Sequence, residues 1–453
     1  MSKEKIFLII GFLCFSLLFF YFYPPNTGII DETVYISMAY TFEKGSFYYD
    51  QAGIKSAPAS INFNSHLVSR YPPGNSVLLL PFTIIHWKWS FLRGYILMVI
   101  GYIIFIIILA HFRLPLYYAL LFLFHPSFIL YSRTLMSDLP ATILCLLGLL
   151  FLVRKRIFIS GLLFGFSIAI RYPVMLIPLS LWIVFLLKRK FNESIKLLAG
   201  AFIGIIPLIF YHLFCFRTII GPAGANIIGF SITNLPIMLL QFFVSLNILY
   251  PFLFIAVFKT RLKEKCFFII PAVLFLIFFS LQYYIDTGNN LFENIVRGQR
   301  YTLPIIPFLL IAYAEVLGQI KILDKVIKTF FVVLILMSAY IHHKHQQFLI
   351  QQSDYQKKLY EYTSNAGIIV CNKDIYELIN PFIKTINWIP FESEGKLLPV
   401  NITEDNQSVY IACLARNENI KKLFFELLDK ITLKKEIYRE NAPYYFSIWC
   451  LGK

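Results

Sequence analysis

Long apolar runs are the feature that most constrains what this chain can fold into. The sequence has 453 residues, of which 58% are hydrophobic and 15% are charged. Ordinary soluble domains carry about 25% charged residues. Runs this apolar and this frequent must lie in a lipid bilayer. The pattern therefore predicts an α-helical polytopic membrane protein, and it excludes a water-soluble enzyme, a disordered chain and a disulfide scaffold.

About eleven transmembrane helices are expected. We interpret Met1–Tyr23 as an uncleaved first span rather than a signal peptide, because no small-residue cleavage site follows it. The stretch 157–187 is either two short helices broken at Arg171 or one long kinked helix. The remaining candidate spans are 92–112, 115–131, 137–153, 195–214, 235–257, 266–284, 302–318 and 328–342.

The basic residues between the runs predict the orientation. Positive charges collect on the cytoplasmic side of a membrane protein, and a cytoplasmic N-terminus places six basic loops there. An odd number of spans then puts the C-terminus outside. The formal net charge is +16, but residues 343–453 hold 14 basic and 13 acidic residues, so they carry no basic face for nucleic acid. The Lys-, Ile- and Phe-rich composition is typical of an AT-rich bacterial genome, and on that basis we expect the membrane to be a bacterial plasma membrane.

Two domains are predicted. Residues 1–342 form the transmembrane domain, whose first external loop, at about 24–90, contains an interfacial helix at 75–87. Residues 343–453 form a small extracytoplasmic α/β domain. Its expected elements are strands at 367–371 and 409–414, helices at 375–383 and 419–431, and a hairpin at 436–451. Asn401 and Asn406 begin short glycosylation sequons. The seven cysteines show no CxxC spacing, which argues against zinc or redox chemistry, and their odd number gives no disulfide framework.

Carboxylates at the outer boundary are the first candidates for chemistry. Asp31 and Glu32 follow the first span, and Asp138 begins the fourth. A carboxylate at such a boundary is costly unless it has a partner or a function, and it could act as a general base. The alternative is that Asp31-Glu32 caps a juxtamembrane helix and that Asp138 marks a helix start.

Arginine dominates among the external cations. Seven of the ten basic residues on the external side of the membrane part are Arg, whereas the cytoplasmic side has five Arg and twelve Lys. Arginine is the better residue for contacts to phosphate in a partly dehydrated site. Arg171 and Arg300 lie at the external ends of spans and could hold a lipid phosphate. Snorkelling, or pairing with Asp31 or Asp138, is the alternative.

Four short blocks occur in order along the membrane part. They are Asp31–Tyr35, Tyr71–Asn75, Ser132–Pro140 and Arg300–Pro304. In order, spacing and side of the membrane, this set resembles the GT-C superfamily of integral-membrane glycosyltransferases. The closest groups are the protein O-mannosyltransferase-like and aminoarabinose-transferase-like enzymes. The resemblance covers roughly residues 5–342.

The resemblance implies an inverting transfer of a sugar from a polyprenyl-phosphate donor at the outer face of the membrane. Asp31 would be the general base, with Glu32 beside it and Asp138 supporting or orienting the acceptor. The donor phosphate would be bound by Arg171 and Arg300, with Arg70 and Arg297 as further candidates. The remaining substrate-binding candidates are His66, Tyr71, Arg133 and Tyr301. The acceptor is a protein, a lipid or a glycan. No cofactor is expected, and the few acidic residues of the first loop do not indicate a divalent metal.

Two other classes of function remain open from the residues. A transporter or flippase of lipid-linked sugars would also use outward arginines, but it would place polar residues near the bilayer midplane. Here the ionisable residues gather at the outer boundary. A membrane-anchored binding module would leave the Asp-Glu pair and the arginines without a role.

Overall fold

The structure is a computed structural model, and it divides the chain into two compact units. The first comprises residues 1–23, 72–75 and 91–345, and the second comprises residues 24–71, 76–90 and 346–453. The described residues are 3–55, 57–221, 230–282, 291–319, 321–385, 387–393, 396–397, 409–431, 434–441 and 443–451. Asn401 and Asn406, the two sequon residues, lie outside them.

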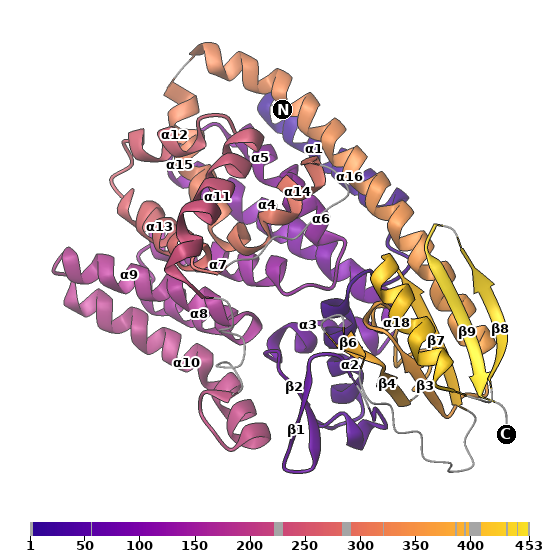
Figure 1. Cartoon of the computed structure of the whole chain (residues 1–453). Helices are drawn as coiled ribbons and strands as arrows, with labels where there is room; N and C mark the ends of the chain where they lie inside the picture. The colour runs from indigo at the N-terminus through magenta and orange to yellow at the C-terminus, as the bar shows by residue number, and fades with distance from the viewer. Residues whose placement is uncertain are drawn as a thin grey trace. The chain divides into compact units, whose positions relative to one another are not determined.

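The first unit is helical (Figure 1), and its apolar helices make the protein integral to a membrane. Five described helices are long and apolar enough to cross a bilayer, and four shorter apolar helices accompany them. The helices of this unit are α1 (Lys3–Tyr21), α4 (Leu92–His111), α5 (Ala119–Leu123), α6 (Pro126–Ser132), α7 (Asp138–Val153), α8 (Ile157–Ile170), α9 (Leu176–Leu187), α10 (Phe191–Phe216), α11 (Leu235–Leu249), α12 (Leu253–Lys259), α13 (Cys266–Ser280), α14 (Leu291–Gly298) and α15 (Ile306–Gln319).

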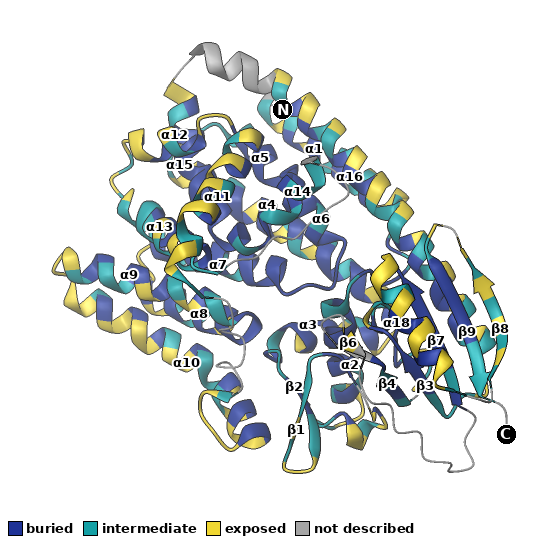
Figure 2. Cartoon of the chain, viewed as in Figure 1, coloured by how far each residue is buried: buried dark blue, intermediate teal, exposed yellow. Residues whose placement is uncertain are grey.

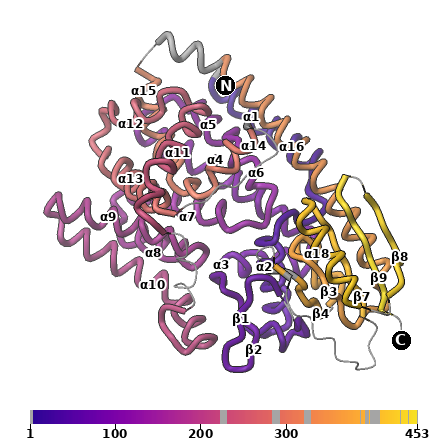
Figure 3. Tube along the Cα trace, in the orientation of Figure 1, coloured from indigo at the N-terminus to yellow at the C-terminus, as the bar shows by residue number. Residues whose placement is uncertain are grey.

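Small residues let α8 and α10 lie side by side (Figure 3). A Cβ added to Gly165 would lie 2.3 Å from the carbonyl oxygen of Ala201, and one added to Gly204 would lie 2.3 Å from that of Leu162. Close approach of backbones at small residues is how helices associate in membranes, where burial of apolar surface gives no driving force. Much of the rest of α10 is exposed, as expected of a surface that faces lipid (Figure 2).

Two predicted spans are broken, and the prediction of single helices there is wrong. Residues 115–131 form a short 3-10 turn at Leu116–Tyr118, then α5 and α6. Pro126 disfavours a helical conformation at the residue before it and begins a new helix instead. Residues 235–257 separate into α11 and α12 around Pro251. At 157–187 the structure adopts the first of the two alternatives, because Arg171 is extended, with φ −152° and ψ 107°, and a 3-10 turn at Tyr172–Met175 precedes α9.

The last predicted span is part of a longer helix. Helix α16 covers Lys321–Tyr362, 42 residues, whereas the apolar run predicted only 328–342. The extension is polar, and its buried Tyr355 and Leu359 belong to the core of the C-terminal sheet domain. Hydropathy marks where a helix can be in lipid, and it does not mark where the helix ends.

The second unit begins with the first loop. This loop forms α2 (Ile30–Glu43), a 3-10 turn at Asp50–Ala52, a hairpin of β1 (Ser60–Phe63) and β2 (His66–Ser69), and α3 (Gly74–Thr83). The first residues of α3, Gly74 and Asn75, belong to the first unit. Helix α3 confirms a helix within the predicted 75–87 segment, although it ends four residues earlier. The hairpin was not predicted, because each strand has only four residues.

A five-stranded mixed sheet forms the C-terminal part, in the order β4-β3-β7-β9-β8. Strand β3 pairs in parallel with β4 and β7, whereas β9 is antiparallel to β7 and β8. Helix α18 packs on one face, and the end of α16 packs on the other. The predicted α/β class is therefore confirmed, but the helix expected at 375–383 is only the four-residue α17. The element bounds are β3 (Ile368–Cys371), α17 (Lys373–Tyr376), β4 (Asn387–Pro390), β7 (Val409–Ala415), α18 (Glu418–Asp429), β8 (Lys434–Glu440) and β9 (Tyr445–Leu451).

Candidate functional site

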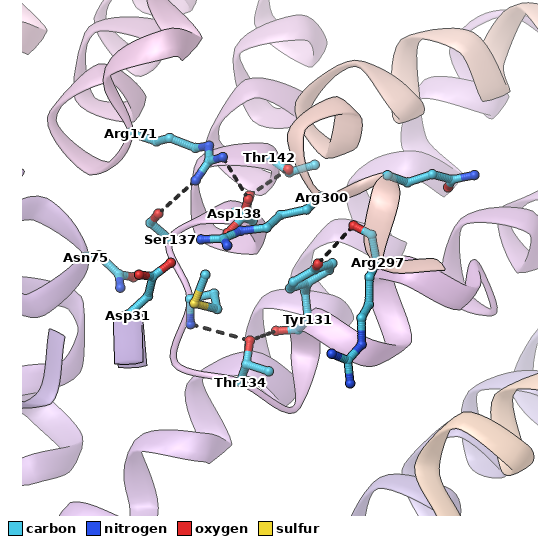
Figure 4. Close-up of polar contacts among 12 residues, drawn as sticks. Asp31, Asn75, Tyr131, Thr134, Ser137, Asp138, Thr142, Arg171, Arg297 and Arg300 are labelled. Atoms are coloured by element: carbon cyan, nitrogen blue, oxygen red, sulfur yellow. Dashed lines mark hydrogen bonds and ion pairs between the residues drawn. The ribbon is translucent and has the colours of Figure 1, made fainter. Parts of the chain in front are cut away.

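An ion-pair cluster around Asp138 lies in the first unit (Figure 4). Oδ1 of Asp138 is 3.1 Å from Nη2 of Arg171, and Oδ2 is 3.5 Å from Nε of Arg300. The Asp138 side chain is fully buried, and the two arginine side chains are 10% and 11% exposed. Two guanidinium groups thus surround one carboxylate. The side chains of this Asp138 cluster leave a formal charge of +1.

Tyr301 joins the two arginines. The guanidinium carbons of Arg171 and Arg300 lie 5.4 Å and 5.6 Å from the centre of its ring, which is cation–π distance. The ring also stacks on Phe279 of α13, at 5.0 Å between centroids and 24° between planes. Nη1 of Arg171 donates to Oγ of Ser137 at 3.3 Å. The contacts with Tyr301 and Ser137 therefore hold the two guanidinium groups next to the Asp138 carboxylate.

The backbone explains how the second sequence block supports this cluster. A Cβ on Gly74 would lie 2.5 Å from the carbonyl oxygen of Ala169, so only glycine fits against the end of α8, two residues before Arg171. The next residue, Asn75, donates from Nδ2 to the carbonyl oxygen of Leu135 at 2.8 Å. Asn75 therefore fixes the loop that leads into Asp138.

Arg93 is a buried arginine whose structural role the sequence did not reveal. It donates to Oδ1 of Asn75 and to the carbonyl oxygen of Met136, the latter at 3.1 Å. It is 4% exposed. It lies in the first turn of the apolar helix α4, a position where arginine commonly anchors a helix at the membrane interface. No local signal distinguishes such an anchor from an arginine that turns inward to hold a loop.

Arg133 and Arg297, two further predicted cations, are not part of the Asp138 cluster. Arg133 is fully buried and donates to the carbonyl oxygen of Phe22 and, at 3.3 Å, to Nδ1 of His345. The hydroxyl of Tyr131 donates a hydrogen bond to the backbone carbonyl oxygen of Arg297 at 3.3 Å. These contacts connect α6 to the two ends of the first unit.

The Asp31 carboxylate belongs to the second unit. The hydroxyl of Tyr71 donates to Oδ1 of Asp31 at 2.7 Å, and the Tyr71 ring packs against Tyr35 at 5.3 Å. Asp31 is half-buried in the first turn of α2. The structure therefore brings two predicted site residues, Asp31 and Tyr71, into direct contact across 40 positions of sequence.

Glu32 closes the start of the same helix. Its Oε2 accepts hydrogen bonds from the backbone N–H groups of Gly28, at 2.7 Å, and Ile29, at 3.1 Å. The side chain is 1% exposed. Carboxylates in the first helical turn commonly satisfy free N–H groups in this way. The capping alternative raised from the sequence thus describes Glu32, whereas Asp31 points its carboxylate to a tyrosine.

His66 and Arg70 sit on the β1–β2 hairpin. Nδ1 of His66 lies 3.0 Å from Oδ2 of Asp50, and Oδ1 of Asp50 accepts from the backbone N–H of Leu67 at 2.8 Å. Partial burial alone would raise the pKa of Asp50, but these hydrogen bonds outweigh it, so the pKa is lowered. Arg70 pairs through its backbone N–H with Ala59.

An apolar groove of about 410 Å³ opens among α11, α12 and α13. It is lined by leucine and phenylalanine side chains, among them Leu276, which lies one turn before Phe279 on α13. Phe279 in turn stacks on Tyr301 of the Asp138 cluster. Among the described residues, no group of three or more His, Cys, Asp or Glu side chains could hold a metal ion.

Comparisons with known proteins identify the fold. No protein-family model matches the chain, and no curated protein sequence matches it. Solved structures do match. The crystal structure of ArnT from Cupriavidus metallidurans in the apo state superposes with a TM-score of 0.66 at 12% identity, over 99% of this chain and 98% of that one. The same protein bound to undecaprenyl phosphate gives 0.61 at 12% identity, over 98% and 97%. The predicted resemblance to the aminoarabinose-transferase-like GT-C enzymes is confirmed for the fold.

Proposed function

We propose that this protein is an inverting glycosyltransferase that takes a sugar from a polyprenyl-phosphate donor at the outer face of the membrane. The observation that carries the proposal is the Asp138 cluster, which combines a net positive charge with shelter from water on an ArnT-like fold. ArnT binds undecaprenyl phosphate, a lipid of the proposed chemical class. The acceptor and the sugar are left open.

Arg171 and Arg300 would bind the donor phosphate. Charge-assisted hydrogen bonds from guanidinium groups suit phosphate oxygens, and in a dehydrated site they stabilise the charge that develops on a leaving phosphate. Asp138 would hold the two arginines apart and oriented. Tyr301 would keep both guanidinium groups in place through cation–π contacts with its ring. The groove, which Leu276 of α13 lines, would offer an apolar surface for part of the polyprenyl chain.

Asp31 would act as general base. It would accept the proton of the acceptor hydroxyl or amine while that atom attacks the anomeric carbon and the bond to the phosphate oxygen breaks. One direct displacement inverts the anomeric centre, and the lipid phosphate leaves with the bonding electrons. Tyr71 would orient the Asp31 carboxylate, in support of which its hydroxyl donates to Oδ1. Glu32 would maintain the helix start that presents Asp31.

The orientation follows from the same proposal. With the N-terminus in the cytoplasm, the basic loops lie inside. The α2 helix and the C-terminal domain then lie outside, in a bacterial plasma membrane. Arg70 and Arg297 are further candidates for binding the donor phosphate, since the contacts described above engage only their backbone atoms. His66 and Arg133 are further candidates for binding the substrate.

The test is transfer of radiolabelled sugar from polyprenyl-phosphate donors in membranes that contain the protein. Wild type is expected to move label to a new product, and Asp31→Asn is expected to lower the rate by about 10²-fold or more, as for loss of a general base. Tyr71→Phe should lower it less. Glu43→Gln is the matched control, because Glu43 is an exposed carboxylate in the last turn of the same helix. Transfer by Asp31→Asn at the wild-type rate would disprove the base assignment.

The alternative is a flippase for lipid-linked sugars. It would move labelled donor lipid across vesicle membranes without forming a new product. The gathering of ionisable residues in the buried Asp138 cluster at the ends of spans, rather than along a path through them, favours transfer over passage.

A further inference from the structure

Helix α2 docks onto the C-terminal sheet domain along one face. Ile30 packs against the domain's hydrophobic core. Oγ1 of Thr33 donates to the carbonyl oxygen of Glu377 at 3.4 Å, and the ring of Tyr40 meets that of Phe382 edge-on at 5.1 Å and 87°. Spacings of three and seven residues place these three side chains on the same side of a helix. The helix that carries Asp31 is therefore held by the last hundred residues of the chain.

Helix α2 contacts the C-terminal domain near the carboxyl ends of the parallel strands β3 and β7. Strands β3 and β7 are parallel neighbours, and β4 lies on the other side of β3. The connection after β3 leads to β4 on one side, and the connection after β7 leads to β8 beyond β9 on the other side. The carboxyl ends of β3 and β7 therefore form a topological switch point, the place where open α/β sheets have a crevice. Open α/β sheets bind ligands at this crevice. Here Glu377 follows β3, Arg416 follows β7, and Glu377 contacts α2.

Arg416 lies at this switch point, directly after β7, and links it to the start of α2. Its Nη2 is 2.6 Å from Oε2 of Glu377, and its Nη1 is 3.8 Å from Oδ1 of Asp374. Its guanidinium lies over the ring of Phe348 at 5.9 Å. Phe348 in turn touches Gly28, where an added Cβ would come within 2.8 Å of the ring. Gly28 is one of the two residues whose N–H groups bind Glu32.

We infer that Arg416 and Glu377 are positioning residues that fix the first turn of α2, and with it the Asp31 carboxylate, from within the C-terminal domain. This inference rests on the proposed function, in which Asp31 is the base. We call this contact, from Arg416 and Glu377 to the first turn of α2, the brace. Its side chains lie at the switch point of the sheet, where other α/β domains bind ligands. A displacement of about 1 Å in a reacting group can cost 10²-fold in rate, so a loosened brace has a measurable effect.

The experiment compares Arg416→Gln with Glu440→Gln in the full-length protein. The control breaks another ion pair of the same domain, Lys358–Glu440 at 2.7 Å, which joins α16 to β8 instead of α2. Hydrogen exchange of the peptide covering residues 28–35 reads the docking without any need for activity. Measurements of kcat and of the donor KM show whether a change in the docking of α2 affects catalysis by Asp31.

Arg416→Gln is expected to speed exchange in residues 28–35 at least fivefold and to lower kcat about tenfold, with the donor KM changed less than twofold, because the two arginines of the Asp138 cluster lie in the other unit. Arg416→Lys should recover part of both effects, and Glu440→Gln should leave both at wild-type values. Thr33→Val should act like a weaker Arg416→Gln. Its control is Thr41→Val, since Oγ1 of Thr41 bonds within α2 to the carbonyl of Ser37.

Three results would overturn the inference. Unchanged exchange at residues 28–35 in Arg416→Gln would show that the pair does not hold α2. Faster exchange with unchanged kcat would show that the brace does not matter for the reaction. Equal loosening throughout the C-terminal domain, matched by Glu440→Gln, would reveal a purely structural role. An inactive wild type with the expected exchange pattern would instead count against the proposed function, leaving the docking established.

Discussion

The carboxylate of Asp138 and the guanidinium of Arg171 lie 3.1 Å apart in a buried ion pair, although the two residues are 33 positions apart in sequence. The sequence offered two interpretations of Arg171 and Arg300, either phosphate binding or pairing with an acid. The structure shows the pairing. Because two arginines share one carboxylate, the cluster keeps a formal charge of +1 that a phosphate could neutralise. The two interpretations are therefore compatible.

Replacing either cluster arginine by lysine should weaken donor binding and slow transfer together. Lysine keeps the charge but loses the planar group that bonds several partners and lies over Tyr301. We expect Arg171→Lys and Arg300→Lys each to raise the donor KM about tenfold and to lower kcat by a similar factor. Arg217→Gln is the control, since Arg217 is an exposed arginine at the end of α10. Steady-state kinetics with a purified polyprenyl-phosphate sugar would check this, and wild-type kinetics for both lysine variants would contradict it.

Asp138→Asn should destabilise the empty protein and make it depend on phosphate. Removing one partner of a buried ion pair costs about 3 kcal/mol or more, and it leaves two cations around one tyrosine ring. A bound lipid phosphate could replace the missing negative charge. Undecaprenyl phosphate is therefore expected to raise the thermal midpoint of Asp138→Asn in detergent more than that of wild type. An equal rise in both proteins would mean that the phosphate binds elsewhere.

Much of the membrane part could be predicted, because its signals are local. Apolar runs predicted most of the membrane helices, and four short blocks predicted the fold. The spans at 115–131 and 235–257 failed for a physical reason. Hydropathy measures how well a segment dissolves in lipid, whereas Pro126 and Pro251 decide whether it is one helix.

The site could be predicted in its residues but not in its contacts. Asp138, Arg171 and Arg300 were each singled out, yet nothing in a sequence says which acid meets which base. Arg93 was missed as a loop anchor because an arginine at a span end has the same appearance whether it snorkels or turns inward. The brace on α2 was missed because it depends on long-range packing between Ile30 and a sheet more than 300 residues away.

The Asp50–His66 pair predicts a pH effect on the β1–β2 hairpin. A carboxyl whose pKa is lowered on folding adds stability above its unfolded pKa of about 3.9, and this stability is lost as the pH falls through the folded value. Both side chains are about one-third exposed, so the contribution is at most about 1 kcal/mol. Asp50→Asn should therefore speed hydrogen exchange of residues 48–69 a few-fold at pH 7. After correction for intrinsic rates, the difference should shrink as the pH is lowered below about 3.9, and a difference that stays constant as the pH falls further would exclude the charge as its cause.

Gly94 provides a test of the packing that presents the Asp138 cluster. A Cβ at this position would lie 1.8 Å from the carbonyl oxygen of Ser132, which is backbone of α6 and cannot move aside as a flexible side chain could. Gly94→Ala should therefore separate α4 from α6, displace the loop that Arg93 and Asn75 hold, and lower both the thermal midpoint and donor binding. Gly318→Ala is the control, because a Cβ there meets nothing closer than 3.7 Å and alanine favours a helix. Thermal unfolding of the two variants in detergent would decide: equal midpoints would mean that the close approach of α4 and α6 does not support the site.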